Sequence, residues 1–156
     1  MTPKFYGVIA LGGTFDIIHI GHIALLNKGF SISKKVIIGL TSDELALRNG
    51  KDLENKFEDR YSALESLINE KFLNSEFEII KLENDFGPAV IEGQVQALVV
   101  STETQHKGDI LNKLRIEKNL EPVKIISVPM VLAEDGNRIS TTRIRDMEID
   151  FNGKLR

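Results

Sequence analysis

Two histidines and a threonine near the start of the chain have the side chains and the spacing needed to bind phosphate. His19 and His22 are three residues apart, so on a helical turn they would lie on one side. Each imidazole can donate an N–H to a phosphate oxygen, and a protonated ring would add positive charge. The hydroxyl of Thr14 precedes them in the same stretch. These residues predict a site for a phosphorylated ligand.

A strand, a turn and the start of a helix are expected to position these side chains. Residues 7–11 form an apolar run typical of a buried strand. We expect Gly12 and Gly13 to adopt backbone angles that a Cβ would forbid, and Gly21 to leave space for the ligand. Apolar residues at helical spacing follow the turn: Ile23, Leu26 and Phe30. Because the first N–H groups of a helix are unpaired at its positive end, the turn predicts an anion site.

A second candidate phosphate site lies near the other end of the chain. Ser140 or Thr141 stands where the N-cap of a final helix is expected. Helix capping alone would explain these hydroxyls. Followed by Thr142 and Arg143, however, the same cap would bring hydroxyls, backbone N–H groups and a guanidinium together. Two such helix starts fit a triphosphate better than a monophosphate.

The composition limits the classes of function. The chain has 156 residues, 42% of them hydrophobic, which suits one domain over residues 1–156. A formal net charge of −3 argues against a general nucleic-acid or membrane-surface binder. The lack of cysteine excludes a disulfide, a thiolate nucleophile and a thiolate metal site, and three histidines leave little material for zinc. We expect a cytoplasmic location, because no signal-type segment is recognisable.

Strands alternate with helices along the chain, which predicts an α/β domain with a Rossmann-like, doubly wound, five-stranded parallel sheet. The expected strands are 7–11, 35–40, 76–82, 97–100 and 124–128, and the expected later helices are 57–72, 108–119 and 140–147. Residues 41–56 read as a loop or irregular helix, and 83–96 as a turn followed by a short helix. If the first strand is central, the order reverses between strands one and four, where ligands bind. Residues 12–14 and 101–104 would then face one crevice.

The two phosphate motifs resemble those of a known superfamily. Gly-Thr-Phe-Asp at Gly13 to Asp16, followed by His-x-Gly-His, resembles the signature of nucleotidyltransferases that join a nucleotide to a phosphorylated small molecule. Residues 139–145 resemble the Ile-Ser-(Ser/Thr)-Thr-x-Ile-Arg motif of the same superfamily. The reaction implied is in-line attack of an acceptor phosphate on the α-phosphorus of a nucleoside triphosphate, without a covalent enzyme intermediate. Mg²⁺ would neutralise the triphosphate, held more by phosphate oxygens and water than by protein side chains.

The resemblance implies a role for each matched residue. The residues expected to act in catalysis are His19, His22, Thr14 and Arg143. Those expected to contact the nucleotide are Gly12, Gly13, Thr14, Phe15, Gly21, His22, Ser101, Thr102, Glu103, Ser140, Thr141, Thr142 and Arg143. The histidines would hold the α and β phosphates, residues 140–143 the β and γ phosphates, and residues 101–103 the adenosine half.

Further motifs resemble one branch of the superfamily, the phosphopantetheine adenylyltransferases of the archaeal and eukaryotic type. The matched residues are 99–104 (Val-Val-Ser-Thr-Glu-Thr) with Gly108, Asn112 and Arg115, and 85–88, where Phe86 replaces a tyrosine. The likeness, from about Lys4 to Asp146, implies transfer of AMP from ATP to 4′-phosphopantetheine. Thr14, Asp85 and Arg115 would serve the acceptor. Arg48 or Lys51 would meet its phosphate, unless both belong to a solvated charged loop.

Other functions remain open at this stage. The motifs His-Ile-Gly-His and Ser-Thr-Thr also resemble CTP-dependent cytidylyltransferases for glycerol phosphate or choline phosphate, and an FMN adenylyltransferase is a further possibility. The Arg-Thr-x-Gly lead-in of the cytidylyltransferases is missing, because residues 135–138 read Asp-Gly-Asn-Arg. A module that senses ATP without turnover is an alternative of another class. The expected partners are small molecules only, with the oligomeric state left open.

Overall fold

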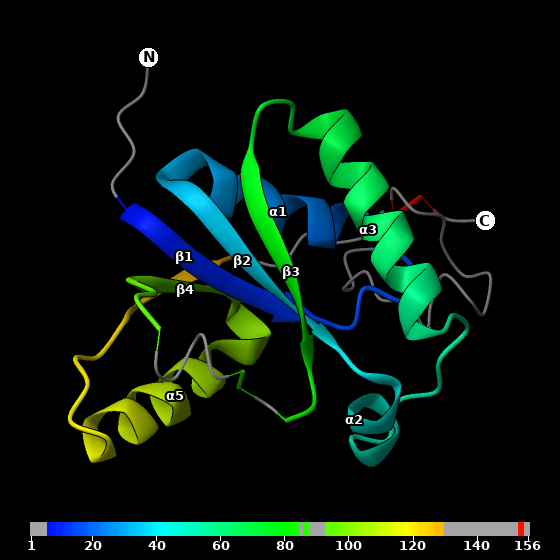
Figure 1. The fold of residues 1–156 in the computed structure, drawn as a ribbon. Coiled ribbons are helices and arrows are strands. Elements are labelled where there is room, and N and C mark those ends of the chain that lie inside the picture. Colours follow the sequence, from blue (N-terminus) through cyan, green and yellow to red (C-terminus); the bar gives the residue numbers. More distant parts are fainter. Residues whose placement is uncertain (1–5, 85, 88–92, 130–152, 155–156) are drawn as a thin grey trace.

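Five parallel strands form the central sheet of the part of the chain that this computed structural model describes, namely residues 6–84, 86–87, 93–129 and 153–154. They are β1 (Tyr6–Gly13), β2 (Ser33–Thr41), β3 (Glu76–Leu82), β4 (Ala97–Ser101) and β5 (Lys124–Val128). Their spatial order is β3-β2-β1-β4-β5, with every neighbouring pair parallel (Figure 1). The predicted doubly wound sheet is confirmed, and its order reverses between β1 and β4.

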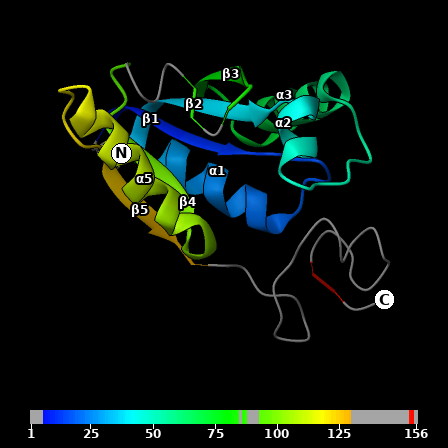
Figure 2. The ribbon, with the colours of Figure 1, turned by 90° about the horizontal axis from the view of Figure 1, so that it is seen from below.

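Helices cover both faces of this sheet. Ile9 and Leu11 of β1 belong to a core cluster that includes side chains of α1 (Ile20–Ile32) and α3 (Phe57–Lys71). Ala10, between them, faces a second cluster with Leu111 of α5 (Gln105–Glu117). Figure 2 shows α1 running alongside β1, and α5 alongside β4 and β5. Because both faces are buried, each central strand contains a continuous apolar run, which is the pattern that predicted it from the sequence.

Several element boundaries differ from those predicted. The first strand continues through Gly13, because Gly12 and Gly13 pair with Gly39 and Leu40 of β2. Within residues 41–56 the chain forms the short helix α2 (Asp43–Arg48), whose N-cap Ser42 accepts the N–H of Leu45 at 3.0 Å. The helix predicted at 108–119 begins earlier, because the short 3-10 turn η1 (Thr102–Thr104) leads directly into α5. The predicted helix 140–147 and most of the predicted helix within 83–96 lie outside the described residues.

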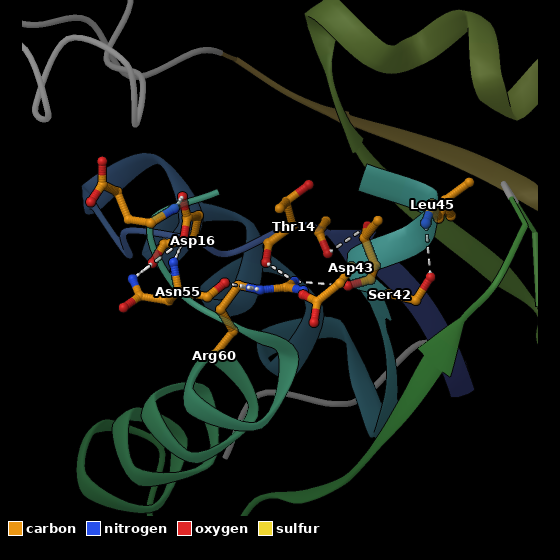
Figure 3. Close-up of polar contacts among 10 residues, drawn as sticks. Thr14, Asp16, Ser42, Asp43, Leu45, Asn55 and Arg60 are labelled. Carbon is orange, nitrogen blue, oxygen red and sulfur yellow. Dashed lines mark hydrogen bonds and ion pairs between the residues drawn. The ribbon is translucent and has the colours of Figure 1, made fainter. Parts of the chain in front are cut away.

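A fully buried arginine joins the carboxyl ends of β1 and β2 (Figure 3). Arg60, in the first turns of α3, donates from Nη1 to the carbonyls of Thr14 at 2.9 Å and Thr41 at 2.7 Å. Its Nε donates to the carbonyl of Asn55 at 3.1 Å, and its Nη2 forms an ion pair with Asp43 at 2.7 Å. This residue of the predicted helix 57–72 therefore bonds to four residues in three segments of the chain.

We expect Arg60→Met to destabilise the fold severely. The substitution fills much of the same volume but leaves three carbonyls, one buried and two partly buried, without their donor, so we predict a loss of about 3 kcal/mol or more in the free energy of unfolding. Urea denaturation followed by circular dichroism measures this loss.

The matched control is Asp43→Asn, which keeps Arg60 and its carbonyl partners. The Asp43 side chain is 41% exposed but is the counter-charge of a buried guanidinium, so its neutralisation should cost about 1–2 kcal/mol, less than the loss of all the donors of Arg60. Near-equal effects of the two substitutions would contradict the central role of the three carbonyls.

Candidate active site

A cavity of about 200 Å³ opens at the carboxyl ends of β1, β2 and β4, next to the reversal in strand order. The turn after β1 contributes Thr14, β4 ends in it with Ser101, and Thr104 and Lys107 reach it from η1 and α5. The first motif and the segment after β4 therefore share one cavity, as the predicted sheet order requires.

Close-packed glycines shape the wall of this cavity. Gly12 and Gly39 are paired across β1 and β2 and both line it. A Cβ at Gly12 would lie 3.3 Å from the carbonyl oxygen of Gly39, and one at Gly39 only 2.6 Å from a methyl carbon of Leu82. The expectation of special backbone angles at Gly12 and Gly13 was wrong, because both residues continue the strand and neither has a positive φ. Glycine is needed here for close approach.

The unusual backbone angle belongs to Phe15, whose φ is +50°. This left-handed conformation is rare for a bulky residue. The ring is buried in the core, with Cε2 3.0 Å from the place where a Gly13 Cβ would stand, and its centroid is 4.8 Å from that of His22. Phe15 thus supports the turn and the histidine from within the core, although it was expected to contact the nucleotide.

His19 and His22 cap the start of α1. Nδ1 of His19, the N-cap, accepts the N–H of Gly21 at 3.1 Å, and Nδ1 of His22 accepts the N–H of His19 at 3.2 Å. The rings are stacked with centroids 3.9 Å apart. Because both Nδ1 atoms accept hydrogen bonds, each neutral ring carries its proton on Nε2, where it can be donated to a ligand. The space left by Gly21 serves the His19 ring, since a Cβ there would lie 2.9 Å from Cε1.

The surroundings of His22 favour the neutral ring. Burial is the main cause that lowers the pKa of His22 from 6.5 to about 3, and the neighbouring His19 and the positive charge of Lys51 act in the same direction. The protonated form considered from the sequence is therefore disfavoured at this position, and His22 is suited to donate a hydrogen bond from an uncharged Nε2–H. The cavity lining includes Gly13 and Thr14 but neither histidine; the histidines are linked to it through Lys51, which lines the cavity and whose charge acts on His22.

The structure separates the two basic residues that the sequence left as alternatives. Lys51 lines the cavity, whereas Nη2 of Arg48 donates to the carbonyl of Glu83 and Arg48 is not a lining residue. Lys107 of α5 also lines the cavity, although it stands just before the predicted helix 108–119 and was not among the predicted site residues. None of the described lining residues is acidic. Two lysines therefore give a positive character to a cavity in a chain whose net charge is −3.

Comparisons with known proteins agree with this geometry. Residues 10–147 match the Cytidylyltransferase-like family. The chain is 36% identical over 152 residues to a phosphopantetheine adenylyltransferase of Methanopyrus kandleri, covering 96% of each protein. It is 37% identical over 150 residues to that of Methanothermobacter thermautotrophicus, covering 96% of this chain and 90% of the relative.

The chain belongs to the archaeal phosphopantetheine adenylyltransferase family, within the cytidylyltransferase-like proteins. A solved structure from Archaeoglobus fulgidus, described as a protein of unknown function, is 31% identical with a TM-score of 0.71. The match covers 78% of this chain and 88% of that one. The resemblance inferred from the motifs, and the fold it implied, are confirmed.

Of the remaining residues that matched the adenylyltransferase motifs, some line the cavity and others do not. Ser101 lines the cavity, with its Oγ 3.1 Å from Oγ1 of Thr104, whereas Thr102 is exposed and is not a lining residue. Arg115 is buried near the end of α5, where Nε donates to the carbonyl of Glu121 at 2.7 Å, and the structure does not bring it to the cavity. Glu103 lies in η1. Asp85 and residues 140–143 lie outside the described residues.

Among the described residues, no group of three histidine, cysteine or acidic side chains is arranged to hold a metal ion. None of the described helices combines the length and the apolar character required to cross a bilayer.

We predict that His22 stays neutral, protonated on Nε2, well below the pH at which an ordinary histidine titrates. Long-range ¹H–¹⁵N NMR spectra distinguish the two ring nitrogens and follow their protonation. At pH 5 the spectrum should show a neutral His22 ring with unprotonated Nδ1. Titration of His22 near pH 6.5, or a proton on Nδ1, would contradict the capping geometry.

The same pKa difference predicts how stability depends on pH. Between about 6.5 and 3 the unfolded state binds more protons at His22 than the folded state, so stability decreases as the pH falls through this range. The matched variant is His22→Gln, because glutamine can also accept the capping N–H but does not titrate. Its stability should decrease less steeply over the same range.

Proposed function

We propose that this chain transfers the AMP moiety of ATP to 4′-phosphopantetheine, giving dephospho-coenzyme A and pyrophosphate. The observation that carries the proposal is the cavity beside Thr14, which combines Lys51 and Lys107 with apolar walls and no described acidic lining. Such a cavity suits a ligand with an anionic end and a long, weakly polar arm. The archaeal relatives named phosphopantetheine adenylyltransferases support the same acceptor.

The proposed reaction needs alignment more than acid–base chemistry. An oxygen of the acceptor phosphate attacks the α-phosphorus of ATP, the new P–O bond forms, and the bond to pyrophosphate breaks in line. The attacking phosphate is already ionised, so no strong general base is required. The protein accelerates the step by holding both partners in a reactive orientation and by stabilising the charge that develops on the transferred group.

Each residue of the described site has a place in this scheme. Thr14 and Lys51 would hold the acceptor phosphate, with Lys107 on the wall formed by α5. His19 and His22 would donate from Nε2 to the α and β phosphates. Because the surroundings favour a neutral His22, its contribution is a directed hydrogen bond and not a second positive charge.

The remaining parts of the scheme rest on the family motifs. Residues 101–103 would face the adenosine half, and residues 140–143 the β and γ phosphates. Mg²⁺ would enter with the triphosphate, since the carboxylate of Asp16 is engaged by backbone N–H groups and the described residues offer no metal cluster. We further propose that residues 1–156 form one nucleotidyltransferase domain acting in the cytoplasm.

A pyrophosphate-release assay that crosses two nucleotides with four acceptors tests the proposal. ATP and CTP are each combined with 4′-phosphopantetheine, glycerol 3-phosphate, phosphocholine and FMN. We expect turnover with ATP and 4′-phosphopantetheine only, because the cavity pairs positive charge with apolar walls and the relatives carry that acceptor in their names.

The other outcomes distinguish the alternatives. Preference for CTP with glycerol 3-phosphate or phosphocholine would make the chain a cytidylyltransferase, and turnover with FMN would make it a flavin adenylyltransferase. Binding of ATP with no turnover for any acceptor would favour a nucleotide sensor. Any of these results contradicts the proposal.

A further inference from the structure

Asp16 is buried, and its carboxylate accepts backbone N–H groups from a segment far along the chain (Figure 3). Oδ2 accepts the N–H of Glu54 and Oδ1 accepts the N–H of Asn55, both at 2.9 Å. In return, Nδ2 of Asn55 donates to the backbone carbonyl of Asp16 at 2.9 Å and approaches Oδ1 at 3.3 Å. Residues 38 and 39 positions apart are thus joined by four hydrogen bonds.

These bonds fasten a segment that carries Lys51. Residues 49–56 connect α2 to α3 without forming a helix or strand. At one end, the N–H of Lys51 donates to the carbonyl of Ala46 in α2 at 2.9 Å. At the other end, Asn55 is tied to Asp16 and its carbonyl accepts from Arg60. Lys51 is thus held through its own backbone at the first anchor, close in sequence to the second, and it lines the cavity.

We propose that Asp16 is a positioning residue: it holds residues 51–55 against the turn at Thr14 and thereby sets Lys51 at the acceptor end of the cavity. The inference rests on the proposed function, because it assumes that Lys51 meets the acceptor phosphate. The motif that carries the histidines would therefore also fix the acceptor site, because its Asp16 holds the segment that bears Lys51.

Electrostatics and positioning predict opposite effects for the loss of this carboxylate. A negative charge close to a phosphate site repels the acceptor, so removal of the charge alone should strengthen acceptor binding. Asp16→Asn removes the charge at nearly constant volume. It also turns an amide NH₂ toward one of the two backbone N–H groups, so that one of them loses its acceptor and the segment loosens. A weaker acceptor site is therefore a result that positioning predicts and charge does not.

The test is steady-state kinetics of Asp16→Asn, Lys51→Met and the double variant, with ATP and 4′-phosphopantetheine varied in turn. We expect Asp16→Asn to raise the KM for 4′-phosphopantetheine about 10-fold, while the KM for ATP stays within about twofold. Lys51→Met should raise the same KM at least as much. In the Lys51→Met background, Asp16→Asn should add less than about twofold, because the residue through which it acts has gone.

Arg48→Met is the matched control for Lys51→Met, since it removes a positive charge from the same region but not from the cavity lining. Its KM values should stay within about twofold of the wild type. Asn55→Ala provides a second route to the same loosening. It removes only the side-chain bonds to Asp16 and should raise the acceptor KM in the same direction but less, even where Asp16→Asn folds poorly.

The possible failures of the two ideas are distinguishable. An unchanged acceptor KM in Lys51→Met would overturn the assignment of Lys51, and the positioning role with it. A raised KM in Lys51→Met, combined with an unchanged or lowered KM in Asp16→Asn and Asn55→Ala, would overturn the positioning role alone. Multiplicative effects in the double variant, or a rise confined to the KM for ATP, would also reject it.

Discussion

The burial of one guanidinium group determines the geometry at the carboxyl ends of the central strands. Arg60 has no exposed side-chain surface, and transfer of a permanent charge out of water costs several kcal/mol. Carbonyls of Thr14, Thr41 and Asn55 and the carboxylate of Asp43 offset this cost. A planar fork of five donors can serve four separate acceptors, which a lysine with three donors on one atom cannot do. The site depends on this arrangement because two of the carbonyls belong to its walls.

The ion pair is consistent with this account. Burial raises the pKa of Asp43, but the hydrogen bond from Arg60, the N–H of Phe57 and the charges of Arg60 and Lys81 outweigh it, so the pKa lies below 3.8.

Between Thr14 and His19 the chain is likewise held from several sides. Phe15 at φ +50° carries strain of about 1–3 kcal/mol, and the neighbouring contacts of Thr14 and Asp16 retain it. A turn fixed in this way can present two stacked imidazoles without help from a ligand.

Sequence reasoning succeeded where the information is local or periodic. Apolar runs predicted the strands, and alternation with helices predicted a sheet whose order reverses beside the phosphate motif. The roles of Gly12 and Gly13 were predicted wrongly. A Cβ at Gly12 would meet Gly39 and Leu82 on other strands, and a Cβ at Gly13 would meet the ring of Phe15. Ser42, Asp43 and Glu44 form a recognisable helix start, although residues 41–56 were predicted only as a loop or irregular helix.

Contacts between distant residues explain the other differences. Arg60 and Asp16 acquire their partners only when α3 and the segment before it pack on the first turn. The choice of Lys51 over Arg48 depends on how α2 ends, because two basic residues three positions apart look equivalent in a charged stretch. The position of Lys107 at the cavity follows from the packing of α5 against β4. None of these pairings follows from spacing along the chain.

The central claim is that the hydrogen bonds of Arg60 and Asp16 place the histidine pair and Lys51 around the same pair of substrate phosphates. A crystal structure of the chain with a non-hydrolysable ATP analogue and 4′-phosphopantetheine tests it most directly. The claim predicts Nζ of Lys51 and Oγ1 of Thr14 on the acceptor phosphate, with Nε2 of His22 on the α-phosphate beside it. An acceptor phosphate bound away from Lys51, or a triphosphate that does not contact the histidines, would contradict the account.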